Sequence, residues 1–171
     1  MKKILFAIML LFSTLTMAQR LSVLGIEMGT GIDEAERRLS QRFGEYNVYR
    51  KGTVELTTYD VSVGGSEWKS VKFQFQNKYA SEGVYSYLSK VELSKNFDKK
   101  EYAVTRFNKW AEKLGNKYTK DWDCSENGDQ IIIYNEGVQL EMFYSQSKGG
   151  DYFWYVTIEY SKNFVDESND Y

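Results

Sequence analysis

The chain has 171 residues, with 22 basic and 24 acidic side chains, no histidine, no proline and one cysteine. This charge balance argues against a nucleic-acid partner, which would require a basic surface. The absence of histidine removes the commonest general base and the commonest metal ligand. Cys124 has no second cysteine to pair with, so no disulfide can form within the chain.

The first 18 residues have the pattern of a secretory signal peptide. Lys2 and Lys3 form a basic start, residues 4–12 are mainly apolar, and Thr16-Met17-Ala18 fits a cleavage site. The apolar run is shorter than the ~20 residues of a membrane-spanning helix, which argues against an uncleaved anchor. Cleavage would leave 153 residues (171 − 18) with a net charge of −4 (20 − 24). We therefore expect an exported protein, periplasmic or secreted, with no transmembrane segment after cleavage.

One strand pattern occurs twice. Val91 to Phe97 reads Val-Glu-Leu-Ser-Lys-Asn-Phe, and Ile158 to Phe164 reads Ile-Glu-Tyr-Ser-Lys-Asn-Phe, 67 residues later (158 − 91). Each copy follows a helix-like segment and several alternating segments, which predicts a tandem repeat of a helix-plus-β-meander unit. Convergence of similar half-exposed strands is the alternative. The predicted units are residues 19–97 and 98–164, and an acidic tail, residues 165–171, is expected to fray.

Two helices are predicted. The first follows the turn Gly29-Thr30-Gly31, with Thr30 and Asp33 at capping-box spacing, and ends at Gly44. The second begins after Asp98, where the same capping-box spacing recurs, and it ends at Gly115.

The remaining segments alternate with the period of strands, and Gly64-Gly65 and Gly149-Gly150 mark tight hairpins. A loop is expected at residues 77–83. Helices and strands are segregated within each unit, so the predicted fold class is α+β, with antiparallel sheets and helices packed on one face. The expected strands cover residues 21–26, 54–63, 68–76, 85–94, 130–134, 138–145 and 152–161.

None of the polar clusters has the pattern typical of a catalytic or metal site. The acidic turn of Asp121, Asp123, Ser125, Glu126 and Asp129 has the oxygen ligands that calcium prefers but not the spacing of a calcium loop, because Glu126 stands where glycine is required. Glu92 and Glu159 occupy equivalent places in the two repeated strands, and ordinary strand alternation explains both. No serine, threonine or cysteine has an imidazole to activate it. We expect no enzyme activity, no metal and no cofactor.

Aromatic residues are abundant, with 14 Tyr, 10 Phe and 4 Trp. On residues 152–161 one face carries core candidates, which are Tyr152, Trp154, Val156, Ile158 and Tyr160. Phe153 and Tyr155 point the other way, as does Phe143 on the preceding strand. Two helices suffice to cover one face only, so the second face is a candidate binding surface. Its candidate ligand-binding residues are Tyr59, Phe143, Phe153 and Tyr155.

The segment Leu24-Gly25-Ile26-Glu27-Met28-Gly29-Thr30, with a helix that closes at Phe43-Gly44, resembles a pattern in exported bacterial modules. These are the β-lactamase inhibitory protein fold and the small lipoproteins of the outer-membrane assembly machinery. The resemblance implies non-enzymatic protein binding on an α+β scaffold. The chain lacks the lipidation cysteine and the disulfide cysteines of these families, so no binding residue is carried over.

The expected function is binding of a protein or envelope component without catalysis. The alternatives are a carbohydrate-binding module that uses exposed aromatics and an enzyme of unrecognised type.

Overall fold

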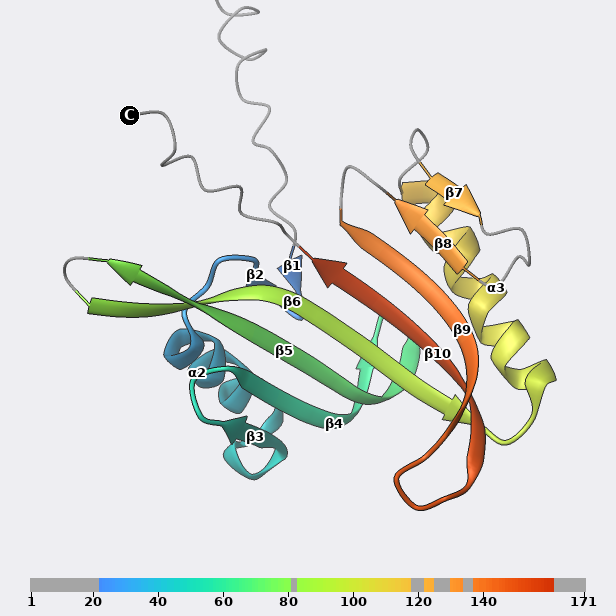
Figure 1. The fold of residues 1–171 in the computed structure, drawn as a ribbon, viewed down its shortest axis with the longest axis horizontal. Coiled ribbons are helices and arrows are strands. Elements are labelled where there is room, and N and C mark those ends of the chain that lie inside the picture. The colour runs from blue at the N-terminus through green and yellow to red at the C-terminus, as the bar shows by residue number, and fades with distance from the viewer. Residues whose placement is uncertain (1–21, 81–82, 118–121, 125–129, 134–136, 162–171) are drawn as a thin grey trace, which may run out of the picture.

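The computed structural model describes residues 22–80, 83–117, 122–124, 130–133 and 137–161 (Figure 1). The predicted signal peptide and acidic tail lie outside this part of the chain. In order, the elements are β1 (Ser22–Val23), β2 (Ile26–Glu27), α2 (Ile32–Phe43), the 3₁₀ turn η1 (Glu45–Asn47), β3 (Val48–Lys51), β4 (Glu55–Val63), β5 (Ser66–Ala80), β6 (Gly83–Phe97), α3 (Lys100–Lys117), β7 (Trp122–Cys124), β8 (Gln130–Ile133), β9 (Val138–Gln146) and β10 (Tyr152–Ser161).

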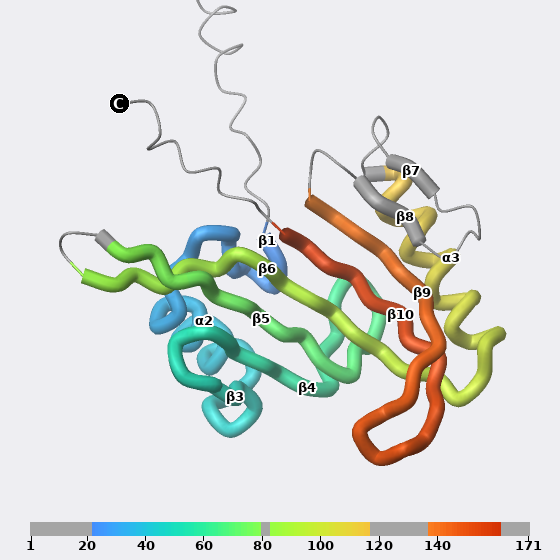
Figure 2. Tube along the Cα trace, viewed as in Figure 1, coloured from blue at the N-terminus to red at the C-terminus, as the bar shows by residue number. Residues whose placement is uncertain are grey.

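The fold is α+β with an antiparallel sheet, as the sequence predicted. Eight strands form one sheet in the order β3-β4-β5-β6-β10-β9-β8-β7, and β1 and β2 form a separate hairpin. The two predicted units share this sheet, because β6 of the first pairs antiparallel with β10 of the second. Figure 2 shows β6 and β10 side by side in the middle of the sheet.

These two central strands carry the repeated sequence pattern. Glu92 lies opposite Glu159, its counterpart in the repeat, and Leu93 lies opposite Ile158. The strand order is symmetrical about this pair, with a helix followed by four strands on each side. A duplicated unit would produce this symmetry, and the duplication itself stays a prediction.

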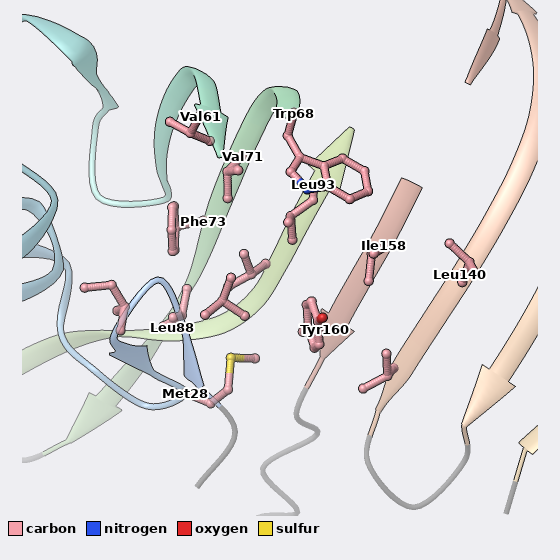
Figure 3. Packing of buried hydrophobic residues seen from close by; sticks show 14 of the residues in the cluster. Met28, Val61, Trp68, Val71, Phe73, Leu88, Leu93, Leu140, Ile158 and Tyr160 are labelled. Atoms are coloured by element: carbon pink, nitrogen blue, oxygen red, sulfur yellow. The ribbon is translucent and has the colours of Figure 1, made fainter. Parts of the chain in front are cut away.

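Both helices contribute to a single hydrophobic core. Figure 3 shows strand side chains from both halves of the sheet, including Leu93, Leu140 and Ile158, in this core. Residues of α2 and α3 belong to the same buried cluster. Full burial of each large side chain contributes about 1.5–3 kcal/mol. The helical members of the cluster are Ile32, Ala35, Leu39, Ala103, Phe107, Trp110 and Leu114.

The β4–β5 hairpin bends at Asp60. This residue has φ 52, the left-handed region that non-glycine residues rarely adopt. Strict alternation would place Trp68 and Val71 on opposite faces of β5, yet both are fully buried in the one core. The left-handed residue interrupts the regular alternation between these two positions, and the end of the hairpin beyond it lies against α3.

Helix α3 holds the end of this hairpin through Trp110 and three basic residues. The Trp110 indole N–H donates to Ser66 Oγ at 3.2 Å, and its ring lies 5.5 Å from that of Trp68. The basic side chains donate to backbone carbonyls of the hairpin, Arg106 to Glu67, Lys109 to Gly65 and Lys113 to Gly64. Burial lowers the pKa of Arg106, whose guanidinium lies 5.5 Å from the Trp68 ring. The second predicted unit is thus bound to the first by direct contacts.

Several predicted boundaries were wrong. Helix α2 has Gly31 at its N-cap with no side-chain cap, so Thr30 does not form the predicted capping box, although Gly44 ends the helix as predicted. Helix α3 continues past Gly115 to Lys117. The loop predicted at residues 77–83 is largely strand, because β5 runs to Ala80 and β6 starts at Gly83. The short strands β3 and β7 were not predicted.

The first turn of α2 contains an ion pair that makes stability depend on pH. Hydrogen bonds from Arg37 and then Arg38, at 2.7 and 2.6 Å, lower the pKa of Glu34 from 4.5 to about 2. A lowered carboxyl pKa stabilises the fold fully above pH 4.5, and the effect is lost as the pH falls toward 2.

Glu34→Gln is therefore expected to lower the unfolding temperature slightly at neutral pH, and this difference should shrink as the pH falls from 4.5 through about 2. Thermal unfolding of both proteins across this range measures the difference. A difference that persisted unchanged at the acidic end would show that the carboxylate is not its cause.

Candidate functional site

One face of the eight-stranded sheet carries no helix among the described residues. Core side chains occupy the opposite face, where α2 and α3 pack. The register places Glu92 and Glu159 on the open face, in a row with Lys72 of β5. Ion pairs connect these strands, with Lys72 Nζ 4.0 Å from Glu92 Oε1 and Lys90 Nζ 2.6 Å from Glu159 Oε2. The centre of the open face is therefore polar, and these four charged side chains are paired.

Aromatic residues interrupt this polar surface at one end of the β9–β10 hairpin. Phe143 and Tyr155 are opposite each other in the register, and their rings stack with centroids 5.3 Å apart and planes 13° from parallel. Phe153 follows on the same face of β10, opposite Ser145. All three aromatic side chains are partly exposed. The open face thus ends in an aromatic group near the turn.

The other face of the same hairpin end is also aromatic. Tyr144 stacks on Tyr152 at 5.5 Å and contacts Trp154 at 5.0 Å. Tyr144 and Tyr152 are each 56% exposed. Lys100, in the first turn of α3, places its ammonium 4.9 Å from the centre of the Trp154 ring. The helix therefore begins beside Trp154, and the two tyrosines lie beyond the core.

We call this group the aromatic hairpin end, defined as Phe143, Tyr144, Tyr152, Phe153, Trp154 and Tyr155. The turn next to it is held by backbone hydrogen bonds, from Ser147 N to Asp151 O at 2.6 Å and from Gly150 N to Ser147 O at 3.0 Å. Gln146 Nε2 adds a bond of 2.8 Å to Gly150 O. In Figure 1 this hairpin projects past the start of α3. Its side chains are thus presented on a well-defined hairpin.

The four predicted site residues share the open face but do not form one cluster. Phe143, Phe153 and Tyr155 belong to the aromatic hairpin end. Tyr59 lies on β4, three strand spacings or about 14 Å from β10. Its ring, 48% exposed, meets Tyr49 edge-on at 5.3 Å. Tyr59 therefore belongs to a separate aromatic pair near the β3 edge.

The sequence interpretation missed Tyr144 and misplaced Tyr152. Tyr152 was predicted to be core, together with the alternate residues of β10, but α3 does not reach it. Trp154 is only partly buried, whereas Val156, Ile158 and Tyr160 are core as predicted. The unbroken run from Tyr152 to Tyr155 was the available signal, because four consecutive aromatics on a strand must occupy both faces.

Acidic and cysteine side chains do not gather into a group of three or more that could hold a metal ion anywhere in the described part of the chain. Most of the predicted acidic turn, namely Asp121, Ser125, Glu126 and Asp129, lies outside that part, while Asp123 belongs to β7. The same residues include no helix that is long and apolar enough to span a membrane.

Comparison with known proteins gave no relative: no family model, no curated protein and no solved structure matches the chain.

Proposed function

We propose that this protein is a non-catalytic, exported binding protein that recognises a protein or envelope component through the aromatic hairpin end. The observation that supports the proposal most directly is the placement of six aromatic side chains on both faces of one hairpin end, two of them more than half exposed. Aromatic residues dominate the binding energy of protein interfaces. The signal-peptide pattern supports export, and the family resemblance also favours protein binding.

The shape of the hairpin end favours a protein partner. A partner with a flat surface would cover one face of the hairpin and leave the other aromatic face in water. A partner protein with a groove would cover both faces. The stacked pairs Phe143–Tyr155 and Tyr144–Tyr152 turn one face of each ring toward its neighbour. A saccharide platform needs open ring faces, so the carbohydrate alternative has less support at this position.

The test is capture from an envelope extract, followed by affinity measurement with the purified partner. Tyr144→Ser/Tyr152→Ser is expected to weaken binding about 100-fold, since each interface tyrosine that acts as an anchor contributes 1 kcal/mol or more. Both side chains are largely exposed, so the variant should keep its circular dichroism spectrum and unfolding midpoint.

The matched control is Tyr46→Ser/Tyr79→Ser, because these tyrosines are 94% and 80% exposed and lie on η1 and β5, away from the hairpin end. The control variant should bind like the wild type. Equal binding by the two double variants would reject the aromatic hairpin end as the contact surface.

A further inference from the structure

The open face contains a depression of about 310 Å³ between β5, β6 and β10. It lies far from the aromatic hairpin end, since Glu159 is six residues from Phe153 along β10, or about 20 Å. Its lining is almost entirely polar, consisting of Gln74, Phe75, Gln76, Ser89, Lys90, Glu159 and Ser161. Of these, only Phe75 is apolar, and that side chain is 4% exposed.

A β-bulge shapes this depression. Gln74 pairs with Lys90, but Phe75 pairs with Leu88, so Ser89 has no counterpart in the register of β5. The Ser89 side chain is buried and donates to the Gln74 carbonyl oxygen at 3.2 Å. Bulges interrupt a ladder and redirect side chains, and they often occur beside binding sites. Here the bulge separates the row of Gln74, Lys90 and Ser161 from the next row, which contains Gln76.

The polar groups of the lining are oriented by their neighbours. Tyr87 Oη donates to Gln76 Oε1 at 3.0 Å, which leaves the Gln76 amide nitrogen as a donor. Lys90 Nζ lies 2.6 Å from Glu159 Oε2, and an ammonium has three protons while a carboxylate has two oxygens. Ser161 Oγ donates to Gly137 O at 3.3 Å and keeps its acceptor capacity. The lining thus offers both donors and acceptors around one small volume.

The charges of the lining cancel. Lys90 and Glu159 are its two charged residues and form an ion pair, and the neighbouring Lys72 and Glu92 pair in the same way. Because each charge is already matched by its partner, the lining has no net charge to attract an ion, and it favours a neutral ligand. The volume is at the lower end of the 300–1,000 Å³ range of ligand pockets.

From this geometry we infer that the depression binds a neutral, hydroxyl-rich ligand of about one monosaccharide unit. Each hydroxyl both donates and accepts, and this matches a lining of amides, hydroxyls and one ion pair. The inference is independent of the proposed partner of the aromatic hairpin end, and either site can fail its test without the other.

Three sugars with the same ring and different charge test the inference by NMR of the ¹⁵N-labelled protein at about pH 6, where the amine of glucosamine is protonated. N-acetylglucosamine is neutral, glucosamine is a cation and glucuronate is an anion. Saturable shifts are expected with N-acetylglucosamine at the amides of Gln74, Gln76, Ser89 and Lys90, with a Kd on the order of 1 mM. The two charged sugars should bind at least ~10-fold more weakly.

Gln74→Leu/Gln76→Leu should weaken N-acetylglucosamine binding at least ~10-fold, because it removes two amides from the lining. Gln139→Leu is the matched control, since Gln139 pairs with Glu159 on the open face but does not line the depression, and this variant should bind normally. A second variant, Glu159→Gln, leaves Lys90 without its carboxylate and should shift the preference toward glucuronate.

Three results would each overturn the inference. The first is the absence of saturable shifts with N-acetylglucosamine up to about 50 mM, well above a millimolar Kd. The second is tighter binding of a charged sugar by the wild type. The third is unchanged sugar preference in Glu159→Gln, a test that does not depend on the folding of the double glutamine variant.

Discussion

Trp68→Ala is expected to lower the free energy of unfolding by about 3–5 kcal/mol, the range for truncation of a large aromatic side chain in a core. Trp68 is fully buried and contacts Trp110 of α3 at 5.5 Å. Its removal would leave a cavity at the point where the bent β4–β5 hairpin meets the helix. Urea unfolding followed by far-ultraviolet circular dichroism measures the loss without relying on tryptophan fluorescence.

Trp68→Phe is the informative comparison. The indole N–H of Trp68 meets no hydrogen-bond acceptor among the described residues, and a buried donor without a partner costs about 1–3 kcal/mol. Phenylalanine keeps much of the volume and removes this donor, so Trp68→Phe should cost far less than Trp68→Ala. Equal losses in the two variants would mean that neither the cavity nor the buried donor has been correctly identified.

Gly137→Ala is expected to destabilise the protein by roughly 3 kcal/mol or more. Gly137 has φ +59, and an added Cβ would lie 1.8 Å from the carbonyl oxygen of Ser161. Left-handed backbone costs an alanine about 1–2 kcal/mol, and overpacking adds about 1–3 kcal/mol. The clash cannot be relieved by a side-chain rotation, because the opposing atom is backbone. The Ser161 N–H also donates to Gly137 O at 2.7 Å, so relief of the clash would break this closing bond between β9 and β10.

Gly65→Ala is the matched control for this substitution. Gly65 has a similar φ of +68, but an added Cβ there would meet no atom within 4 Å. We expect Gly65→Ala to lower the free energy of unfolding only by the cost of left-handed backbone, about 1–2 kcal/mol. The difference between the two midpoints of urea unfolding isolates the clash with Ser161. Similar losses in both variants would contradict the close approach of Gly137 to β10.

The sequence predicted only part of the aromatic hairpin end. Alternation along β10 correctly separated Phe153 and Tyr155 from Val156 and Ile158, because successive strand residues point to opposite faces. Alternation does not say how far along the strand a helix extends. Tyr152 is exposed because α3 begins at Lys100. The Lys100 side chain contacts Trp154, and its described contacts do not include Tyr152.

The polar depression could not be predicted from the sequence. Gln74, Lys90 and Ser161 lie on three strands, and their alignment depends on the register of both β5–β6 and β6–β10. The bulge at Ser89 shifts the first register by one residue, and serine in a strand carries no signal for a bulge. Only the paired strands show which polar side chains surround one volume.

The sequence by itself determined the α+β class, the two helices and most strands, because periodicity and glycine turns are local properties. It also determined that two halves share one order of elements. The tertiary structure decided that the halves join through β6 and β10, and that the β4–β5 hairpin bends at Asp60 to meet Trp110. These features depend on pairing between residues far apart in the chain, and local patterns do not specify which strand edges meet or where a helix stops covering a sheet.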